Sequence, residues 1–70
     1  MNMANLKAEI ARNNLSIPQL ARLVHMDKKT LYSRINGKTS FKQSEIAAIS
    51  KVLELKKDEI MSIFFADMVS

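Results

Sequence analysis

Two helix start signals lie close together in this sequence, and no other feature constrains the fold as much. Ser16 and Gln19 have the S-x-x-Q spacing of a capping box, in which each side chain accepts a hydrogen bond from a backbone N–H at the start of a helix. Asp27 is a second N-cap residue. Both signals are flanked by apolar pairs with the spacing of a hydrophobic staple: Leu15 with Leu20, and Met26 with Leu31. The sequence therefore predicts a helix over about 17–24 and, after about three residues, a second helix.

The second of these helices is expected to end at Gly37, the only glycine in the chain, because a left-handed residue is favoured directly after a helix. The connection between the two helices is so short that their axes must meet at a sharp angle. Hydrophobic spacing predicts three further helices, over about 4–13, 43–53 and 57–64. We therefore expect an all-α fold, a compact bundle of about five short helices in a single domain of residues 1–70.

Composition excludes several classes of function. The chain has no cysteine, so disulfides and thiolate metal sites are impossible, and its one histidine, His25, is better explained as a turn residue than as a metal ligand. No apolar stretch approaches the ~20 residues that span a bilayer, and the first residues lack the pattern of a secretory signal, so we expect a cytoplasmic protein. Without a glycine-rich phosphate loop or a nucleophile paired with a base, we expect neither an enzyme nor a bound cofactor.

The net charge of +4 is unevenly distributed. Residues 1–37 contain six lysines and arginines against two acids, whereas residues 38–70 contain five of each. A surplus of positive charge in one half of a small chain favours a polyanionic partner.

A helical wheel of the segment that follows Asp27 separates a core side from an outer side. Leu31 and Ile35 share the core side, and Arg34 lies on the boundary. The outer side holds no acidic residue and consists of Lys29, Thr30, Tyr32, Ser33 and Asn36. These side chains offer mostly hydrogen-bond donors, which phosphate oxygens and base edges in the major groove accept.

Lys28 and Lys29 stand in the first helical turn, where positive charge opposes the helix macrodipole. Such a local departure in a sequence with otherwise consistent capping indicates a functional position. Simpler explanations stay open for the same surface: the lysines can be solvated, Tyr32 can lie along the surface, Asn36 can cap the helix, and Thr30 can have no role.

The stretch Leu15 to Gly37, LSIPQLARLVHMDKKTLYSRING, resembles the helix-turn-helix of phage repressors, Cro proteins and their bacterial relatives, the XRE-type family. The apolar positions that carry the resemblance are Ala21, Val24, Met26 and Leu31, and it extends through INGKTSF to DEIMSIFFA. Two positions depart from the family pattern. His25 replaces the usual glycine of the turn, and Ile17 and Pro18 stand where many members have a phosphate-contacting glutamine.

The resemblance implies a lambda-repressor-like domain with its helix-turn-helix at about 17–36, which binds double-stranded DNA. Its base-contacting positions correspond to Lys28, Lys29, Ser33 and Tyr32, and its phosphate-contacting positions to Gln19, Thr30, Asn36 and Lys38. A homodimer on a near-palindromic operator is expected, with an interface formed by Phe64, Phe65, Met68 and Val69. The alternative for these four residues is a tail that packs back on its own subunit.

The expected function is that of a sequence-specific transcriptional regulator, similar to a phage Cro or repressor protein in a bacterial cell. The alternative is a protein-interaction module on the same fold, such as an antirepressor or an antitoxin-like adaptor. A third possibility is the DNA-binding half of a longer regulator. The acid-free outer side of the helix after Asp27 favours DNA over a protein partner.

Overall fold

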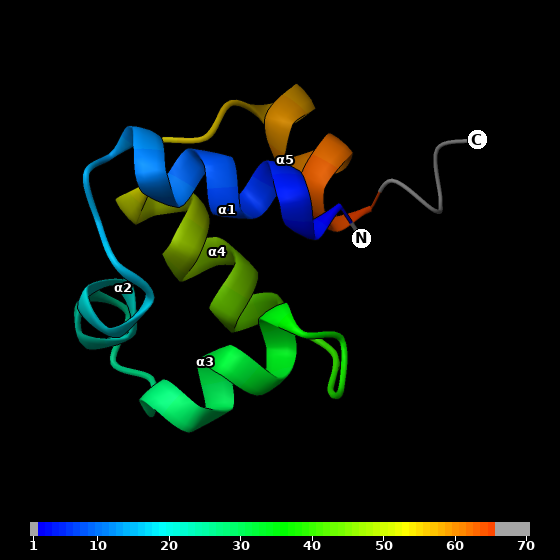
Figure 1. Cartoon of the computed structure of the whole chain (residues 1–70). Coiled ribbons are helices and arrows are strands. Elements are labelled where there is room, and N and C mark those ends of the chain that lie inside the picture. Colours follow the sequence, from blue (N-terminus) through cyan, green and yellow to red (C-terminus); the bar gives the residue numbers. More distant parts are fainter. Residues whose placement is uncertain (1, 66–70) are drawn as a thin grey trace.

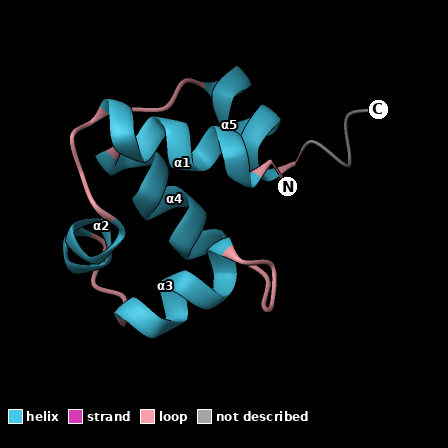
Figure 2. Cartoon of the chain, in the orientation of Figure 1, coloured by secondary structure: helices cyan, strands magenta, loops and turns pink. Residues whose placement is uncertain are grey.

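The computed structural model describes residues 2–65, and within this range it contains five α-helices and no strand (Figures 1 and 2). The helices are α1 (Met3–Arg12), α2 (Ile17–Leu23), α3 (Lys28–Ile35), α4 (Gln43–Val52) and α5 (Lys57–Phe64). The all-α prediction is confirmed, and each predicted helix boundary lies within about one residue of the structural one.

The two predicted start signals form as expected. The Ser16 N–H donates to Oε1 of Gln19 at 2.8 Å, and the Gln19 N–H donates to Oγ of Ser16 at 3.2 Å, so the capping box of α2 is complete. Oδ2 of Asp27 accepts from the Lys29 N–H at 3.0 Å and caps α3. Side chains thus satisfy backbone donors at the starts of both short helices, which would otherwise be unpaired.

Four of the helices end in the same backbone motif. The residue after the C-cap has a positive φ, and two backbone N–H groups donate back to the last turn, which is the Schellman arrangement. The positive-φ residues are Asn14 (57°), His25 (57°), Gly37 (79°) and Glu54 (53°), which follow α1, α2, α3 and α4 in that order. His25 is therefore a turn residue in a left-handed conformation, as predicted.

The four motifs differ in the residue that follows the positive-φ position. It is apolar in three of them and a lysine in the fourth. Leu15, Met26 and Leu55 occupy this position after α1, α2 and α4, and all three pack against the hydrophobic core. After α3 the same position holds Lys38, whose side chain is exposed. The end of α3 therefore lacks the apolar contact that anchors the other three motifs.

Among the residues that the structure describes, ten apolar side chains form the core, and the four largest fully buried ones are Leu6, Leu20, Leu31 and Ile49. They come from α1, α2, α3 and α4, so four helices meet at one centre. Figure 1 shows α4 between α3 on one side and α1 with α5 on the other. Helix α3 is thereby fixed on the outside of the bundle, with one side against the core.

Phe64 belongs to this core. Its side chain is only 6% exposed, and its ring packs edge to face against Phe41, with 5.3 Å between the ring centroids. A role for Phe64 in a dimer interface stays a prediction, and within one subunit the ring is already packed in the core. Phe65 is half-buried, and Met68 and Val69 lie outside the described residues.

Candidate nucleic-acid interface

The site begins with the arrangement of α2 and α3. Helix α2 ends at Leu23 and α3 begins at Lys28, and the turn between them contains His25 in its left-handed conformation. Figure 1 shows α2 nearly end-on where α3 runs across the view, so the two axes meet at a sharp angle. This is the geometry of a helix-turn-helix, in which the second helix is presented on the surface.

Helix α3 has one buried side and one solvent side. Leu31 is fully buried and Ile35 is 2% exposed. The predicted base-contacting residues Lys28 and Lys29 are exposed, and the Tyr32 side chain is 41% exposed. The outer side of the wheel is thus exposed at Lys29 and Tyr32.

Two predicted contact residues on α3 are only partly accessible. Thr30 and Ser33 are half-buried, at the border between the outer side and the core. Asn36, the C-cap residue of α3, is exposed. A hydroxyl at such a border can still donate to a ligand that lies against the helix.

Gln19, a predicted phosphate contact, lies in the first turn of α2. Its Oε1 accepts the Ser16 N–H at 2.8 Å, which holds the exposed amide at the helix start. The capping bond uses only the carbonyl oxygen of the side chain. The amide nitrogen is therefore the atom that can donate to a phosphate.

The segment from Lys28 to Lys42 contains five basic residues and no acidic one. Four of the five are exposed, two in the first turn of α3 and two in the loop before α4: Lys28, Lys29, Lys38 and Lys42. The fifth, Arg34, is largely buried. The surface formed by α3 and this loop is therefore positively charged, and it presents donors at both ends of the helix.

Arg34 has a role that the sequence reasoning missed. Its Nε lies 2.7 Å from Oε1 of Glu45 in the first turn of α4, and its Nη1 donates to Oγ1 of Thr39 at 2.9 Å. The side chains of Arg34 and Glu45 are each 13% exposed. The only signals in the sequence were the boundary position of Arg34 on the wheel and the three-residue spacing from Lys42 to Glu45.

Opposing influences act on the ionisation of Glu45. Burial alone would raise the pKa of this carboxyl, but the Lys42 N–H, which donates to Oε1 at 2.8 Å, and the neighbouring Arg34 guanidinium lower it. The net result is a pKa below the ordinary 4.5. Glu45 is therefore an anion under neutral conditions, and it forms an ion pair with Arg34.

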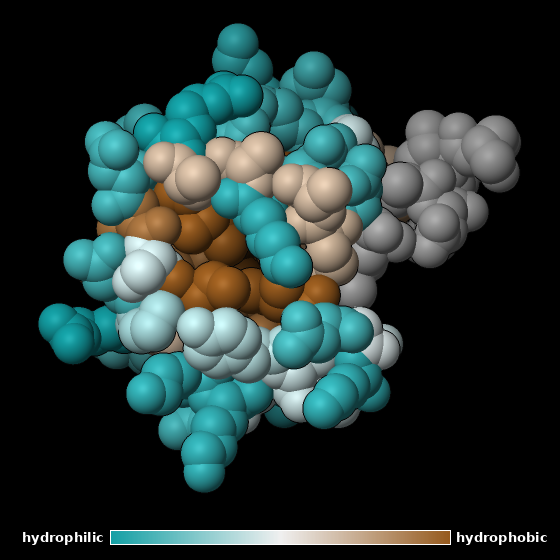
Figure 3. All heavy atoms as spheres, in the orientation of Figure 1, coloured by the Kyte–Doolittle hydropathy of each residue, from teal (hydrophilic) through white to brown (hydrophobic). Residues whose placement is uncertain are grey.

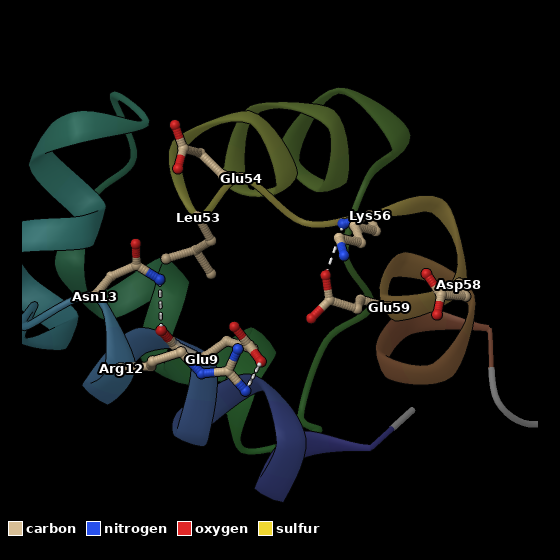
Figure 4. A pocket seen from close by; sticks show the side chains of 8 residues that line it. All are labelled: Glu9, Arg12, Asn13, Leu53, Glu54, Lys56, Asp58 and Glu59. Carbon is tan, nitrogen blue, oxygen red and sulfur yellow. Dashed lines mark hydrogen bonds and ion pairs between the residues drawn. The ribbon is translucent and has the colours of Figure 1, made fainter.

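Acidic residues collect on the side of the molecule away from α3. A polar pocket of about 430 Å³ at the ends of α1 and α4 and the start of α5 is lined by Glu9, Arg12, Asn13, Leu53, Glu54, Lys56, Asp58 and Glu59 (Figure 4). Within this pocket, Nη2 of Arg12 lies 2.9 Å from Oε1 of Glu9 and forms an ion pair with it. Oε1 of Glu59 accepts a hydrogen bond from the Lys56 N–H at 2.8 Å. These groups serve to hold the ends of the helices.

Hydrophilic side chains lie along both the upper and the lower edges of the face shown in Figure 3. On the face shown in Figure 3, apolar atoms gather at the centre, between α1 and α3, while the edge formed by α3 carries mainly hydrophilic side chains. Within residues 2–65 no three His, Cys, Asp or Glu side chains are grouped so that they could hold a metal ion. No helix in this part of the chain has both the length and the apolar character to cross a membrane.

Comparison with known proteins gives one family. A family model described as Helix-turn-helix matches residues 6–60, a range that contains α2, the turn and α3 in full. No curated protein and no solved structure matches the chain. The match covers most of the sequence and includes the sharply angled pair of helices. The chain therefore belongs to the XRE-type, Cro-like helix-turn-helix family of DNA-binding transcription regulators.

Proposed function

We propose that this protein is a sequence-specific transcriptional regulator of the phage Cro or repressor type, which binds a near-palindromic operator as a homodimer. In this proposal α3 enters the major groove and α2 lies across the DNA backbone. The observation that carries it is the acid-free segment from Lys28 to Lys42, whose exposed lysines lie at the start of α3 and in the loop after it. A rigid, cationic helix of this kind fits a groove between two rows of phosphates.

Sequence would be recognised by residues on the outer side of α3. Lys28 and Lys29 can donate to the O6 and N7 acceptors of guanine, and the Ser33 hydroxyl can bond to a neighbouring base. The exposed ring of Tyr32 offers both a hydroxyl and an apolar face to the same groove. Of these four residues, Lys29 has the strongest support, because the helical wheel and the family pattern both select it and its side chain is both basic and exposed.

Phosphate contacts would position the helix without reading sequence. Gln19 and Thr30 lie toward the starts of α2 and α3, whereas Asn36 and Lys38 lie where α3 ends. Donors of this kind on both sides of a groove bind the two strands that border it.

Dimerisation would supply the affinity that one small module lacks. Phe65 is half-buried and lines an apolar groove between α4 and α5 with Ile46, Ala47 and Ile60. We assign this groove to a second copy of the chain, because Phe65, which the sequence selects for the interface, lines it. A two-fold pair would place its half-sites about one helical turn apart.

Selection of bound duplexes from a random DNA pool tests the proposal directly, since it reports binding, sequence preference and half-site symmetry together. On the selected operator, Lys29→Ala and Ser33→Ala should each weaken binding by about 1–3 kcal/mol and relax the preference at one base position. Lys7→Ala, which removes an exposed charge from α1, is the matched control and should leave sequence preference unchanged.

Two results would contradict the proposal. Equal affinity of wild type and Lys29→Ala for the selected operator would remove Lys29 from base recognition. Wild-type protein without salt-dependent affinity for any duplex would remove the DNA-binding function and favour the adaptor alternative.

A further inference from the structure

We infer that Arg34 is a positioning residue for the DNA backbone, because it fixes the loop between α3 and α4 and so holds Lys38 in place to meet a phosphate. This inference rests on the proposed function and adds to it a residue that is not itself a DNA ligand. We call the group formed by Arg34, Thr39, Glu45 and the Lys42 N–H the Arg34 cluster.

The Arg34 cluster joins three parts of the chain. Arg34 lies in the last turn of α3, Thr39 lies in the middle of the loop, and Glu45 lies in the first turn of α4. Nη1 of Arg34 holds the Thr39 hydroxyl at 2.9 Å, and Nε lies 2.7 Å from Oε1 of Glu45. The same Oε1 accepts the Lys42 N–H at 2.8 Å, so the loop is held at its middle and at its end.

The first half of the loop needs such a connection, because the apolar anchor of this loop, Phe41 packed on Phe64, lies near its end. After α1, α2 and α4, the residue that follows the positive φ is apolar and packs on the core, which anchors the outgoing chain. After α3 that residue is Lys38, whose exposed side chain cannot serve as an anchor. Arg34 supplies a polar anchor one residue later, at Thr39, and leaves Lys38 free to face solvent or DNA.

Arginine is suited to this role, and lysine is not. The guanidinium is a planar group with several nitrogens, so Nη1 can donate to Thr39 in the loop while Nε forms an ion pair with Glu45 in α4. A lysine ammonium also has three donors, but they sit on one nitrogen at the end of a flexible stem and cannot hold two separate partners in a fixed plane. The Arg34 side chain is only 13% exposed, and its guanidinium is paired with the Glu45 carboxylate. Its positive charge is therefore not directed at a DNA phosphate.

A loop that is already ordered before DNA binds should raise the affinity for DNA, because less conformational entropy is lost on binding. A lysine on an ordered loop loses less freedom when it meets a phosphate than one on a loop that must first be ordered. Because a phosphate contact carries no base information, the loss of Arg34 should weaken binding to all sequences by a similar factor. Sequence preference, set by α3, should stay as it is.

A double-mutant cycle tests this inference. Arg34→Met, Lys38→Ala and the double variant are compared with wild type by fluorescence anisotropy on the selected operator and on an unrelated duplex, over a range of salt concentrations. Arg34→Met should weaken binding to both duplexes by roughly three- to tenfold, the equivalent of ordering one or two side chains. Lys38→Ala should flatten the slope of log K against log salt by about 1. In the Lys38→Ala background, Arg34→Met should lower the affinity for DNA by roughly twofold or less, because the lysine that Arg34 positions is already absent.

Loop order is measured without DNA, by amide hydrogen exchange in the loop. Arg34→Met and Glu45→Gln should speed exchange at the Lys42 N–H, which donates to the Glu45 carboxylate, whereas Lys38→Ala should not. Thr39→Val keeps the shape of the side chain but removes the bond to Nη1, so it serves as the second variant if Arg34→Met fails to fold. It should act in the same direction with a smaller effect, and Arg34→Lys should not restore wild-type binding.

The possible failures are distinguishable. If Arg34→Met lowers the affinity for DNA by the same factor in wild type and in Lys38→Ala, then Arg34 contacts DNA by itself and the positioning role is wrong. If the variant binds as tightly as wild type, the inference also falls, while the proposed function stands. If wild type binds no duplex at all, the proposed function fails first and the inference fails with it.

Discussion

At the scale of single residues, the least usual feature is the set of left-handed backbone positions that carry side chains. Asn14, His25 and Glu54 have φ values between 53° and 57°, and only Gly37 is a residue that adopts such a conformation without steric cost. Asparagine and histidine tolerate positive φ better than most residues, whereas glutamate has no such tendency. Each of these residues lets a helix end within one residue and the chain turn toward the next element.

Glu54→Gly should raise the free energy of unfolding by about 1 kcal/mol, because glycine removes the steric cost of the left-handed conformation. Urea unfolding followed by circular dichroism measures the change. Glu54→Gln is the matched control: it removes the charge but keeps a side chain with the same backbone cost, so it should reproduce little of the gain.

The reverse change at Gly37 tests the same principle. Gly37 has φ 79°, and an added Cβ would have no atom within 4 Å, so the cost of Gly37→Ala would be conformational only. A loss of about 1 kcal/mol is expected. Equal stability of Gly37→Ala and wild type would contradict this account of both positions.

At the scale of elements, all five helices are too short to be stable alone. The longest, α1 and α4, have 10 residues each, whereas isolated helices of fewer than about 12–15 residues are marginal in water. Their stability comes from capping hydrogen bonds at the helix starts, from the Schellman ends of α1 to α4, and from one buried side each. The link between α3 and α4 adds an ion pair between the elements, in which one carboxylate oxygen both caps α4 and faces Arg34.

This carboxylate gives the stability a predictable dependence on pH. Because the pKa of Glu45 is lower in the folded chain than the ordinary 4.5, its contribution is fully present above that value. The contribution is lost as the pH falls through the lowered pKa. Glu45→Gln should therefore be less stable than wild type at neutral pH, and the difference should shrink as the pH falls toward about 3.

Urea unfolding of wild type and Glu45→Gln at a series of pH values measures this difference. A difference of the same size at pH 7 and at about pH 3 would mean that the charge of Glu45 contributes nothing and that the substitution acts through packing alone.

At the scale of the whole molecule, charge is unevenly distributed. The exposed lysines of α3 and its loop lie in a segment without acids, whereas the polar pocket at α1, the end of α4 and α5 is lined by four acids and two basic residues. Such a distribution orients the protein toward a polyanion before any contact is made. The apolar groove between α4 and α5 is separate from both surfaces, so a second copy can bind there without covering α3.

Phe65→Asp should raise the dissociation constant of the proposed dimer and leave the subunit helical, because a charge in the groove must be desolvated when a second copy binds. Sedimentation velocity over a range of concentrations measures the constant. Met61→Asp, at an exposed position on α5 outside the groove, is the control and should not change it. Dimers of unchanged affinity in Phe65→Asp would place the interface elsewhere.

What could be predicted from the sequence follows from the range of the interactions involved. Capping boxes, staples and helix ends depend on residues within about four positions of one another, so spacing alone located all five helices and the turn at His25. The outer side of α3 was also predictable, because a regular helix converts sequence position into direction.

Tertiary structure alone decided the contacts between elements. Arg34 could have faced solvent, DNA or a partner, and only the position of α4 brings Glu45 within 2.7 Å of it. Phe64 could have been left for a second subunit, and only the packing of Phe41 against its ring makes it part of the core. Both outcomes depend on how helices with known boundaries pack together, which is set by the shape of the whole core rather than by local spacing.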